Sequence, residues 1–406
     1  MFFTLKHIEG PIIKEINLPS SKSISNRILI IQSFCEKQFK IENLSKSDDT
    51  KNLKQALLLK NNIIDAGEGG TTLRFLLTFL ACKEGEWKLS GSKRLMHRPI
   101  EQLIDAIKKL GGDIEWKKTH WLIKGKTMAG GKLNINASVS SQFVSSLLLV
   151  APTFKKGFQL SLKGKVVSSS YIDMTIELMR EFGIEVCVNE KTISVPPGKY
   201  QSKNFSVETD WSAASYFYEL AALNPGSKIF LKSLKDDSLQ GDRVVAELFA
   251  VFGVNSFFND KGVLIENIIT AKTQSHKECN NLIFDIKDCP DLFPPLAVTC
   301  AVKKMNATFK NTSHLNSKES ERANVFAHLL QQLNCKVKQT KNTFSIDTKN
   351  FQLPSSNFQL KTHNDHRIAM SFAPLASLFS SITFDSEKVV NKSFPGFWKE
   401  FKKKNS

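Results

Sequence analysis

Residues 69–81 read GGTTLRFLLTFLA, in which glycine and threonine precede an apolar run with the 3.6-residue period of a helix. Eight further segments also begin with small polar residues and continue as an apolar helical run: residues 20–34, 138–151, 168–183, 209–223, 238–253, 289–301, 316–330 and 364–379. Short β-branched or alternating segments lie between the helical runs and predict strands: residues 40–44, 87–90, 158–162, 193–195, 228–231 and 381–384. This alternation predicts an α/β (α+β) fold built from repeated units.

The polar openings allow two interpretations. Ser, Thr, Asp and Asn commonly cap helices, because their side chains satisfy the free amides of the first turn. If many of these helices run in parallel, however, their amino ends could also converge on one cleft and favour phosphate or carboxylate ligands. The sequence alone leaves both interpretations open.

Length and composition exclude several protein classes. A chain of 406 residues predicts about two to three domains. With 41% hydrophobic and 23% charged residues, the chain does not resemble a disordered protein. Its richest apolar stretch, residues 147–151, stops at Pro152 and is far shorter than a membrane span. Lys6 and Glu9 interrupt the place of a secretory signal, so we expect a cytoplasmic protein. Seven cysteines without a C-x-x-C pair favour reduced thiols.

The basic residues suggest anionic partners. The formal net charge is 56 − 39 = +17, and only eight of the 56 basic residues are arginine. The lysines are spread along the whole chain, which favours a solvated surface over a nucleic-acid patch. Arginine grips carboxylate or phosphate through two parallel hydrogen bonds, so the few arginines mark the places to examine.

Several of the predicted helix starts combine polar and charged residues. Lys22, Ser23 and Arg27 lie within six residues, and residues 67–74 are glycine-rich but match neither common nucleotide-binding pattern. Lys318 and Arg322 have the i, i+4 spacing of one helix face, which a surface ion-pair network would also show. His363, Asp365 and His366 could suggest a metal, but they do not complete a ligand set, so we predict no metal site.

Taken together, the segments resemble the 5-enolpyruvylshikimate-3-phosphate synthase family. The matching motifs follow the family's order nearly from end to end: Lys22-Ser23-x3-Arg27, Gly70-Thr71-x2-Arg74, Arg98-Pro99-Ile100, Ser140-Ser141-Gln142-Phe143, Ser168-x2-Tyr171-Ile172-Asp173, Gln240-Gly241-Asp242, Pro290-Asp291, Lys318-Glu319-Ser320-x-Arg322, Asn364-Asp365-His366-Arg367 and Lys392-Ser393-Phe394-Pro395. A single motif of this kind is weak, but ten in the same order are specific.

The resemblance implies the architecture. It implies a two-domain inside-out α/β barrel, in which each domain has three βαβαββ-like repeats and the substrates bind between the domains. Residues 21–208 would form the first domain, and residues 1–20 with 209–406 the second. The stretch from residue 49 to 67 is shorter than the family usual, so one repeat is expected to be truncated.

The resemblance also implies an activity. The family transfers the enolpyruvyl group of phosphoenolpyruvate to the 5-hydroxyl of shikimate 3-phosphate through a tetrahedral adduct, in the shikimate pathway, without a cofactor and usually as a monomer. Two phosphates and two carboxylates bring about −5 to −6 of charge. Seven matched cations could balance them: Lys22, Arg27, Arg98, Lys318, Arg322, Arg367 and Lys392.

The family's binding residues carry over position by position. The phosphoenolpyruvate side would comprise Lys22, Gly70, Arg98, Gln142, Arg322, Arg367 and Lys392. The shikimate side would comprise Ser23, Arg27, Ser140, Ser141, Ser168, Tyr171, Asp291 and Lys318. For catalysis, Asp291 is suited to take the hydroxyl proton, and either Glu319 or Lys22 to protonate the methylene carbon.

Two positions depart from the family, and two other functions stay open. Glu68 and His314 stand where the family commonly has asparagine. The sister enolpyruvyl transferase for UDP-N-acetylglucosamine has the same fold, but it usually carries Lys-Asn at the place of Lys22-Ser23 and a reactive loop cysteine near Arg98, for which Cys82 is the nearest candidate. A non-catalytic anion or nucleic-acid binder would also exploit the positive charge.

Overall fold

The computed structural model describes residues 2–59, 61–136, 140–268, 281–353 and 357–405. The chain folds as two compact units. We call Ser20–Val207 the central unit, and Met1–Pro19 together with Glu208–Ser406 the terminal unit. The terminal unit thus contains both ends of the chain.

Four sheets repeat one pattern of four strands. When the strands of each sheet are numbered along the chain, their order across the sheet is first, second, fourth and third. The first and second strands are parallel, and the other neighbouring pairs are antiparallel. The central unit contains β4 (Ile63–Asp65), β5 (Gly85–Ser90), β7 (His120–Gly125) and β6 (Asp113–Lys117), and then β8 (Gly131–Asn136), β9 (Phe158–Lys163), β11 (Thr192–Val195) and β10 (Cys187–Asn189). The terminal unit contains β2 (Ile13–Asn17), β13 (Lys228–Lys232), β15 (Gly262–Asn267) and β14 (Val254–Asn259), and then β16 (Leu282–Asp285), β17 (Ala307–Lys310), β19 (Thr343–Asp347) and β18 (Lys336–Gln339).

This pattern follows from how strands can be connected. Two parallel strands need a crossover, which a helix supplies, whereas the last two strands of each sheet form a hairpin. The crossover from β2 to β13 contains the whole central unit.

Two further sheets are shorter. The terminal unit pairs β20 (Asn357–Leu360), β21 (Ser381–Phe384) and β1 (Phe3–Lys6). In the described part of the central unit, β3 (Ile41–Glu42) and β12 (Phe205–Ser206) form a parallel two-stranded sheet. The short sheet agrees with the expectation of a truncated repeat, because only four residues separate the end of α2 (Asp48–Leu58) from the start of β4 at Ile63, too few for a hairpin of two strands.

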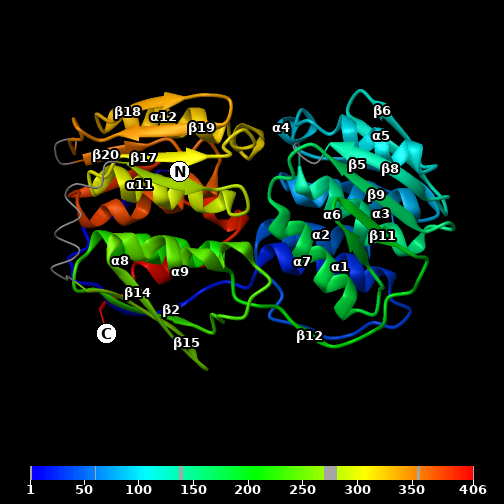
Figure 1. The fold of residues 1–406 in the computed structure, drawn as a ribbon, viewed down its shortest axis with the longest axis horizontal. Helices are drawn as coiled ribbons and strands as arrows, with labels where there is room; N and C mark the ends of the chain where they lie inside the picture. The colour runs from blue at the N-terminus through cyan, green and yellow to red at the C-terminus, as the bar shows by residue number, and fades with distance from the viewer. Residues whose placement is uncertain (1, 60, 137–139, 269–280, 354–356, 406) are drawn as a thin grey trace. The chain divides into compact units, whose positions relative to one another are not determined.

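The helices lie on the inner sides of the sheets in each unit (Figure 1). The central unit has α1 (Lys22–Phe34), α2, α3 (Gly70–Cys82), α4 (Lys93–Met96), α5 (Glu101–Lys109), α6 (Ser141–Val150) and α7 (Ser169–Glu181). The terminal unit has α8 (Trp211–Leu223), α9 (Val245–Leu248), α11 (Phe293–Val302), α12 (Arg322–Gln332), α13 (His366–Phe372) and α14 (Phe397–Phe401). The central unit also has the short 3-10 turn η1 (Ala151–Thr153). The terminal unit has the short 3-10 turns η2 (Gly241–Val244), η3 (Phe249–Phe252), η5 (Pro290–Leu292), η6 (Leu315–Ser317), η7 (Ala373–Ser377) and η8 (Lys388–Lys392).

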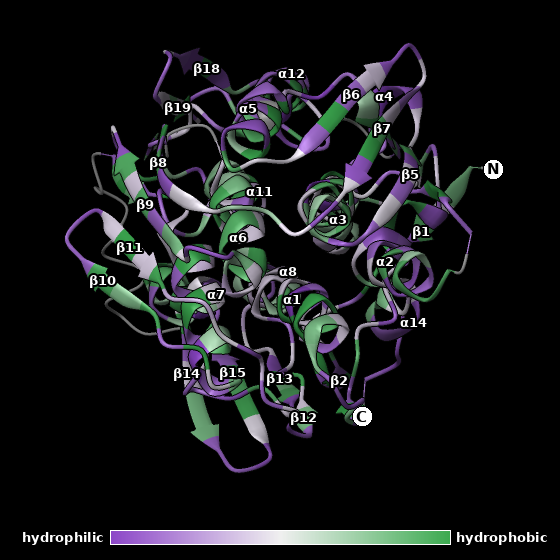
Figure 2. Ribbon diagram, turned by 90° about the vertical axis from the view of Figure 1, so that its right-hand side faces the viewer, coloured by the Kyte–Doolittle hydropathy of each residue, from purple (hydrophilic) through white to green (hydrophobic). Residues whose placement is uncertain are grey.

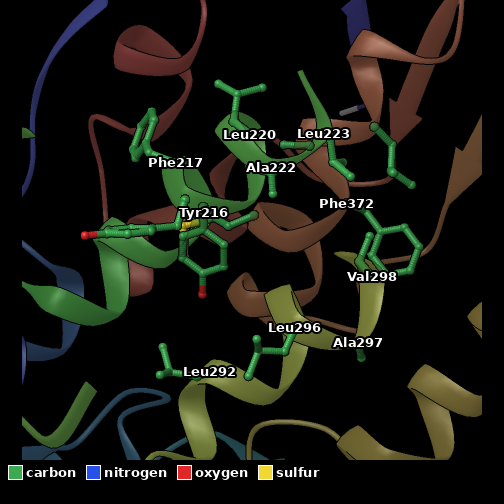
Figure 3. Close-up of a cluster of buried hydrophobic side chains, with 14 of the residues drawn as sticks. Tyr216, Phe217, Leu220, Ala222, Leu223, Leu292, Leu296, Ala297, Val298 and Phe372 are labelled. Atoms are coloured by element: carbon green, nitrogen blue, oxygen red, sulfur yellow. The ribbon is translucent and has the colours of Figure 1, made fainter. Parts of the chain in front are cut away.

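Several helices are buried on nearly every side. In α8, every residue but Ser212 is buried, and in α11 every residue but Val302. Figure 2 shows hydrophobic colouring along α6 and α11. In the terminal unit, α8 and α11 pack together through Tyr216, Leu220 and Leu296 among other side chains, and Phe372 of α13 belongs to the same cluster (Figure 3). A helix that is apolar all round is stable only inside a core, so these helices form the centre of each unit.

The sequence predictions of local structure are confirmed, with two corrections. Strands lie in all six predicted places, and helical turns form in all nine, although residues 138–139 lie outside the described residues. The predicted helix over residues 238–253 is instead η2, α9 and η3 in succession. The predicted helix over 364–379 is α13 followed by η7, because Pro374 has no amide hydrogen to continue the α-helical bonds.

Two other observations bear on the sequence analysis. The six cysteines among the described residues are free thiols, and Cys279 lies outside the described residues. Within the described ranges, no helix combines the length and the apolar character needed to cross a membrane.

Candidate functional site

The predicted site residues belong to both units. The central unit contains Lys22, Ser23, Arg27, Gly70, Arg98, Ser140, Ser141, Gln142, Ser168 and Tyr171. The terminal unit contains Asp291, Lys318, Glu319, Arg322, Arg367 and Lys392. Neither unit therefore contains the whole predicted set.

The start of α3 brings three predicted residues together. The guanidinium of Arg98 lies against the α-carbon of Gly70, where Arg98 Nη1 is the atom nearest to the place of a missing Cβ. Arg74 donates from Nη1 to the carbonyl of Gly70 at 2.9 Å and supports the turn from the other side. Gln142 Nε2 donates to Thr71 Oγ1 at 2.9 Å. Gly70, Arg98 and Gln142 thus surround the first turn of one helix, where backbone amides are available to an anion.

Lys22 pairs with Asp49, which was not predicted as a site residue and which contacts the start of α3. Its Nζ donates to Asp49 Oδ2 at 3.0 Å, with the two side chains 14% and 7% exposed. The carbonyl of Asp49 accepts from Thr72 Oγ1 at 3.1 Å, in the first turn of α3. Sequence reasoning missed Asp49, although its position in the first turn after the cap Ser47 was a readable helix-start signal.

Arg27 lies in a network of buried hydrogen bonds. Its Nε donates to Thr175 Oγ1 at 2.7 Å, and Nη2 donates to Ser145 Oγ and to the carbonyl of Tyr171, both at 3.0 Å. Nη1 donates to the carbonyl of Ser23 at 2.8 Å. Arg27 is only 2% exposed, and burial lowers its pKa to about 10. The structure therefore brings Ser23, Arg27 and Tyr171 together and links α1, α6 and α7.

The remaining serines of the central unit begin two helices that pack against each other. Ser140 caps α6, accepting from the amide of Gln142 at 3.3 Å, and buried Ser141 follows it. Ser168 precedes α7 with a left-handed φ of 55°, and its carbonyl accepts from the amide of Tyr171 at 3.2 Å. Ser145 Oγ of α6 donates to the carbonyl of Tyr171, in the first turn of α7, at 3.2 Å, so the two helices meet near their starts.

In the terminal unit, Arg322 is surrounded by carboxylates. Its side chain is fully buried. Nε donates to Asp365 Oδ2 at 3.1 Å, Nη2 to Glu319 Oε2 at 2.7 Å, and Nη1 to Asp291 Oδ1 at 3.2 Å. This arrangement keeps the guanidinium charged: burial opposes the charge, but the three carboxylates outweigh it and raise the pKa of Arg322 above its usual value.

Asp291 is shared among three cations. Its Oδ2 accepts from Arg367 Nη2 at 2.7 Å, and its Oδ1 lies 3.2 Å from Arg322 Nη1 and 3.8 Å from Lys318 Nζ. Burial alone would raise the pKa of Asp291, but Arg367, Lys318 and Arg322 together hold that pKa well below its usual range. Arg367 also donates from Nη1 to Tyr216 Oη at 3.2 Å. The structure thus brings five of the six predicted residues of this unit into one network.

The sixth, Lys392, is placed by its element. It ends η8, which packs against α13, the helix that begins at His366 and carries Arg367. The two departures from the family differ in exposure. Glu68 is exposed in the loop before α3. His314 is buried, and burial together with the nearby positive charge of Lys318 lowers its pKa to about 3, so it is neutral near pH 7 like the asparagine that it replaces.

Three residues of the terminal-unit network were not predicted as site residues. Asp365 and Asp242 belong to two of the motifs that match the family, so the sequence did point to them. Asp242 accepts a short hydrogen bond from Ser212 Oγ, and burial together with the charge of Asp291 raises its pKa to about 7. Tyr216, in the middle of an apolar helix, gave no signal in the sequence. Among the described residues no group of three or more His, Cys, Asp or Glu could hold a metal ion.

Comparisons with known proteins identify the family. The family model described as EPSP synthase (3-phosphoshikimate 1-carboxyvinyltransferase) matches residues 6–59 and 52–401. A 3-phosphoshikimate 1-carboxyvinyltransferase of Bacteroides fragilis strain YCH46 is 36% identical over 402 residues, covering 96% of this chain and 94% of its own length. One of Methanosphaerula palustris is 32% identical over 420 residues, covering 96% of both chains.

Solved structures show the same fold. An EPSP synthase structure from Acinetobacter baumannii superposes with a TM-score of 0.74 at 20% sequence identity, covering 98% of this chain and 97% of its own. This chain therefore belongs to the EPSP synthase (3-phosphoshikimate 1-carboxyvinyltransferase) family.

Proposed function

We propose that this protein transfers the enolpyruvyl group of phosphoenolpyruvate to the 5-hydroxyl of shikimate 3-phosphate, giving 5-enolpyruvylshikimate 3-phosphate and inorganic phosphate. The reaction belongs to the shikimate pathway and supplies chorismate and the aromatic amino acids. The observation that carries the proposal is the position of Asp291, a carboxylate held by Arg322, Arg367 and Lys318, in a chain that the family model matches from residue 6 to residue 401.

Phosphoenolpyruvate requires several cations and a close backbone approach. We assign its binding to Lys22, Gly70, Arg98 and Gln142 in the central unit and to Arg322, Arg367 and Lys392 in the terminal unit. The cluster at the start of α3 supports this assignment, because it joins a guanidinium, an amide side chain and the amino end of a helix.

Shikimate 3-phosphate needs acceptors for its hydroxyls as well as a site for its phosphate. We assign its binding to Ser23, Arg27, Ser140, Ser141, Ser168 and Tyr171 in the central unit, and to Asp291 and Lys318 in the terminal unit. Serine hydroxyls at helix starts can contact a phosphate or a sugar-like hydroxyl. Arg27 is largely committed to protein acceptors, so we expect it to orient Ser23 and Tyr171 as much as to bind the ligand.

The chemistry requires one base and one acid. Asp291 takes the proton of the 5-hydroxyl while that oxygen attacks C2 of phosphoenolpyruvate, and Glu319 or Lys22 protonates the methylene carbon to give the tetrahedral adduct. The phosphate then leaves and a proton is removed from the new methyl group, which restores the double bond. The protein's own groups supply these steps, so we propose no cofactor and no metal.

The setting of the protein is part of the same proposal. Each unit corresponds to one enolpyruvyl-transferase domain, divided at residues 21–208 and 1–20 with 209–406. We propose that the protein acts in the cytoplasm as a monomer, with small-molecule substrates and neither nucleic acid nor membrane as partners. The absence of nucleic-acid and membrane partners is supported by the lysines, which are spread along the whole sequence instead of being concentrated in one basic segment.

The test is phosphate release from phosphoenolpyruvate by the purified chain. We expect release with shikimate 3-phosphate, none without an acceptor, and none with UDP-N-acetylglucosamine. Release with the sugar nucleotide alone would identify the sister transferase. Salt-sensitive anion binding without any turnover would instead identify a non-catalytic binder.

A further inference from the structure

The ion pairs of the terminal-unit cluster join equal numbers of cations and carboxylates. Three cations, Lys318, Arg322 and Arg367, face three carboxylates, Asp291, Glu319 and Asp365. The guanidinium groups that we assign to phosphoenolpyruvate are therefore already paired with carboxylates of the chain. An incoming anion gains little from such a cluster unless one of these carboxylates gives up its place.

The three carboxylates on Arg322 are not equivalent. Asp365 is completely buried and each of its oxygens has two donors. Its Oδ2 accepts from Arg322 Nε at 3.1 Å and Ser320 Oγ at 2.9 Å, and its Oδ1 accepts from Arg322 Nη2 at 3.3 Å and the amide of Arg367 at 3.0 Å. Asp365 also caps α13, so it fixes the start of that helix to Arg322.

Asp291 and Glu319 are more accessible. Their side chains are 12% and 19% exposed, whereas those of Arg322 and Asp365 are 0% exposed. Asp291 lies in the single 3-10 turn η5, and Glu319 lies between η6 and α12, outside any helix. Short irregular segments can move a side chain at lower cost than a capped helix can.

We propose that Asp291 and Glu319 are exchangeable counter-ions, whose places on Arg322 and Arg367 are taken by the anionic groups of the substrate, while Asp365 is a permanent positioning residue. This inference rests on the proposed function and deepens it. Its consequence is a coupling between binding and catalysis. As long as Arg322, Arg367 and Lys318 contact Asp291, its pKa is low and it is a weak base. When these cations turn to the bound substrate, the pKa of Asp291 rises, and it becomes a stronger base at the moment when the acceptor hydroxyl is present.

The test measures binding of phosphoenolpyruvate alone to the full chain by calorimetry, without shikimate 3-phosphate. For Asp291→Asn we expect a Kd lower than that of the wild type by about tenfold, because a competing charge-assisted partner is removed. Glu319→Gln should change the Kd in the same direction. Asp365→Asn should raise the Kd by about tenfold or more, because Arg322 and the start of α13 lose their anchor. A merely structural role would weaken binding in all three variants.

The matched control is Asp260→Asn, which removes one negative charge from an exposed turn of the same unit. If the control tightens binding as much as Asp291→Asn, the effect is one of net charge and the inference fails. Melting temperatures identify variants that do not fold, and Glu319→Gln is the variant that disturbs burial least. Unchanged or weaker binding in both Asp291→Asn and Glu319→Gln overturns the proposal.

A second probe separates this inference from the proposed function. Inorganic phosphate binding is compared in the same variants. If the wild type does not turn over the substrates, the proposed function fails, yet tighter phosphate binding by Asp291→Asn still supports exchangeable counter-ions. If the wild type turns over and neither anion binds the two variants more tightly, only the counter-ion inference fails.

Discussion

The guanidinium of Arg98 occupies the space that a side chain on Gly70 would need. The nearest atoms to a Cβ at position 70 are Arg98 Nη1 and Arg74 Nη1, both nearer than normal packing allows. The backbone of Gly70 is not left-handed, and Gly70 is the first residue of α3. The glycine is therefore needed for space and not for backbone freedom.

Gly70→Ala should raise the KM for phosphoenolpyruvate without destabilising the fold. The methyl group must displace the Arg98 guanidinium, and losing one charge-assisted contact costs about 1.5–3 kcal/mol, or roughly 10- to 150-fold in KM. Alanine is a better helix residue than glycine, so the melting temperature should not fall. Steady-state kinetics and thermal unfolding check both expectations. The control is Gly198→Ala, where a Cβ would make only an ordinary contact with Ile184.

Arg98→Ala should lose at least as much binding, about 1.5–3 kcal/mol or more, because the whole guanidinium is removed. Phosphoenolpyruvate titration measures the loss. Arg180→Ala is the matched control, since Arg180 forms a half-exposed ion pair with Glu177 on the same unit. Wild-type affinity in Arg98→Ala would contradict the assignment of Arg98 to this substrate.

Arg27→Lys should destabilise the central unit. Lysine cannot reproduce the planar fork that reaches Thr175, Ser145 and Tyr171, so buried acceptors would be left unpaired at a cost of about 2–4 kcal/mol. The midpoint of urea unfolding measures the cost. The same substitution at exposed Arg180 should stay within about 0.5 kcal/mol of the wild type. Equal effects at the two positions would show that the Arg27 network contributes no stability.

Glu219→Gln should change the pH dependence of stability. Glu219 is fully buried in α8, and among the described residues neither carboxylate oxygen has a hydrogen-bond partner. Burial raises its pKa well above 4.5, so the folded state keeps a proton that the unfolded state releases. The wild type should lose about 1.4 kcal/mol per pH unit from this group as pH rises above 4.5, until the folded pKa is reached.

The glutamine variant carries no ionisable group at this position and should lack that slope. It should therefore be more stable than the wild type at pH 8 and equally stable near pH 4, as measured by chemical unfolding at each pH. Glu177→Gln, at an exposed position, controls for the general loss of a carboxylate. Identical pH slopes for wild type and Glu219→Gln would show that the carboxyl group is ionised in the folded protein.

Local structure was readable from the sequence because its causes lie in neighbouring residues. Caps such as Ser140 and Asp365 and the apolar period of α3 and α6 predicted where helices begin and which segments enter the core. Pro374 inside the last predicted helix was visible too, yet its effect on the helix end was underestimated. The order of the charged motifs predicted the family.

The tertiary structure alone decided which charges meet. From the sequence, seven cations were expected to be available to the substrates. In the structure, however, Lys22 pairs with Asp49, 27 residues away along the chain, and Arg322 pairs with Asp365, 43 residues away. No periodicity connects such pairs, because they depend on how separate segments of the chain pack in space. A buried guanidinium needs hydrogen-bond acceptors, and the fold decides where these lie. Only the folded chain therefore shows that Lys22 and Arg322 already have carboxylate partners.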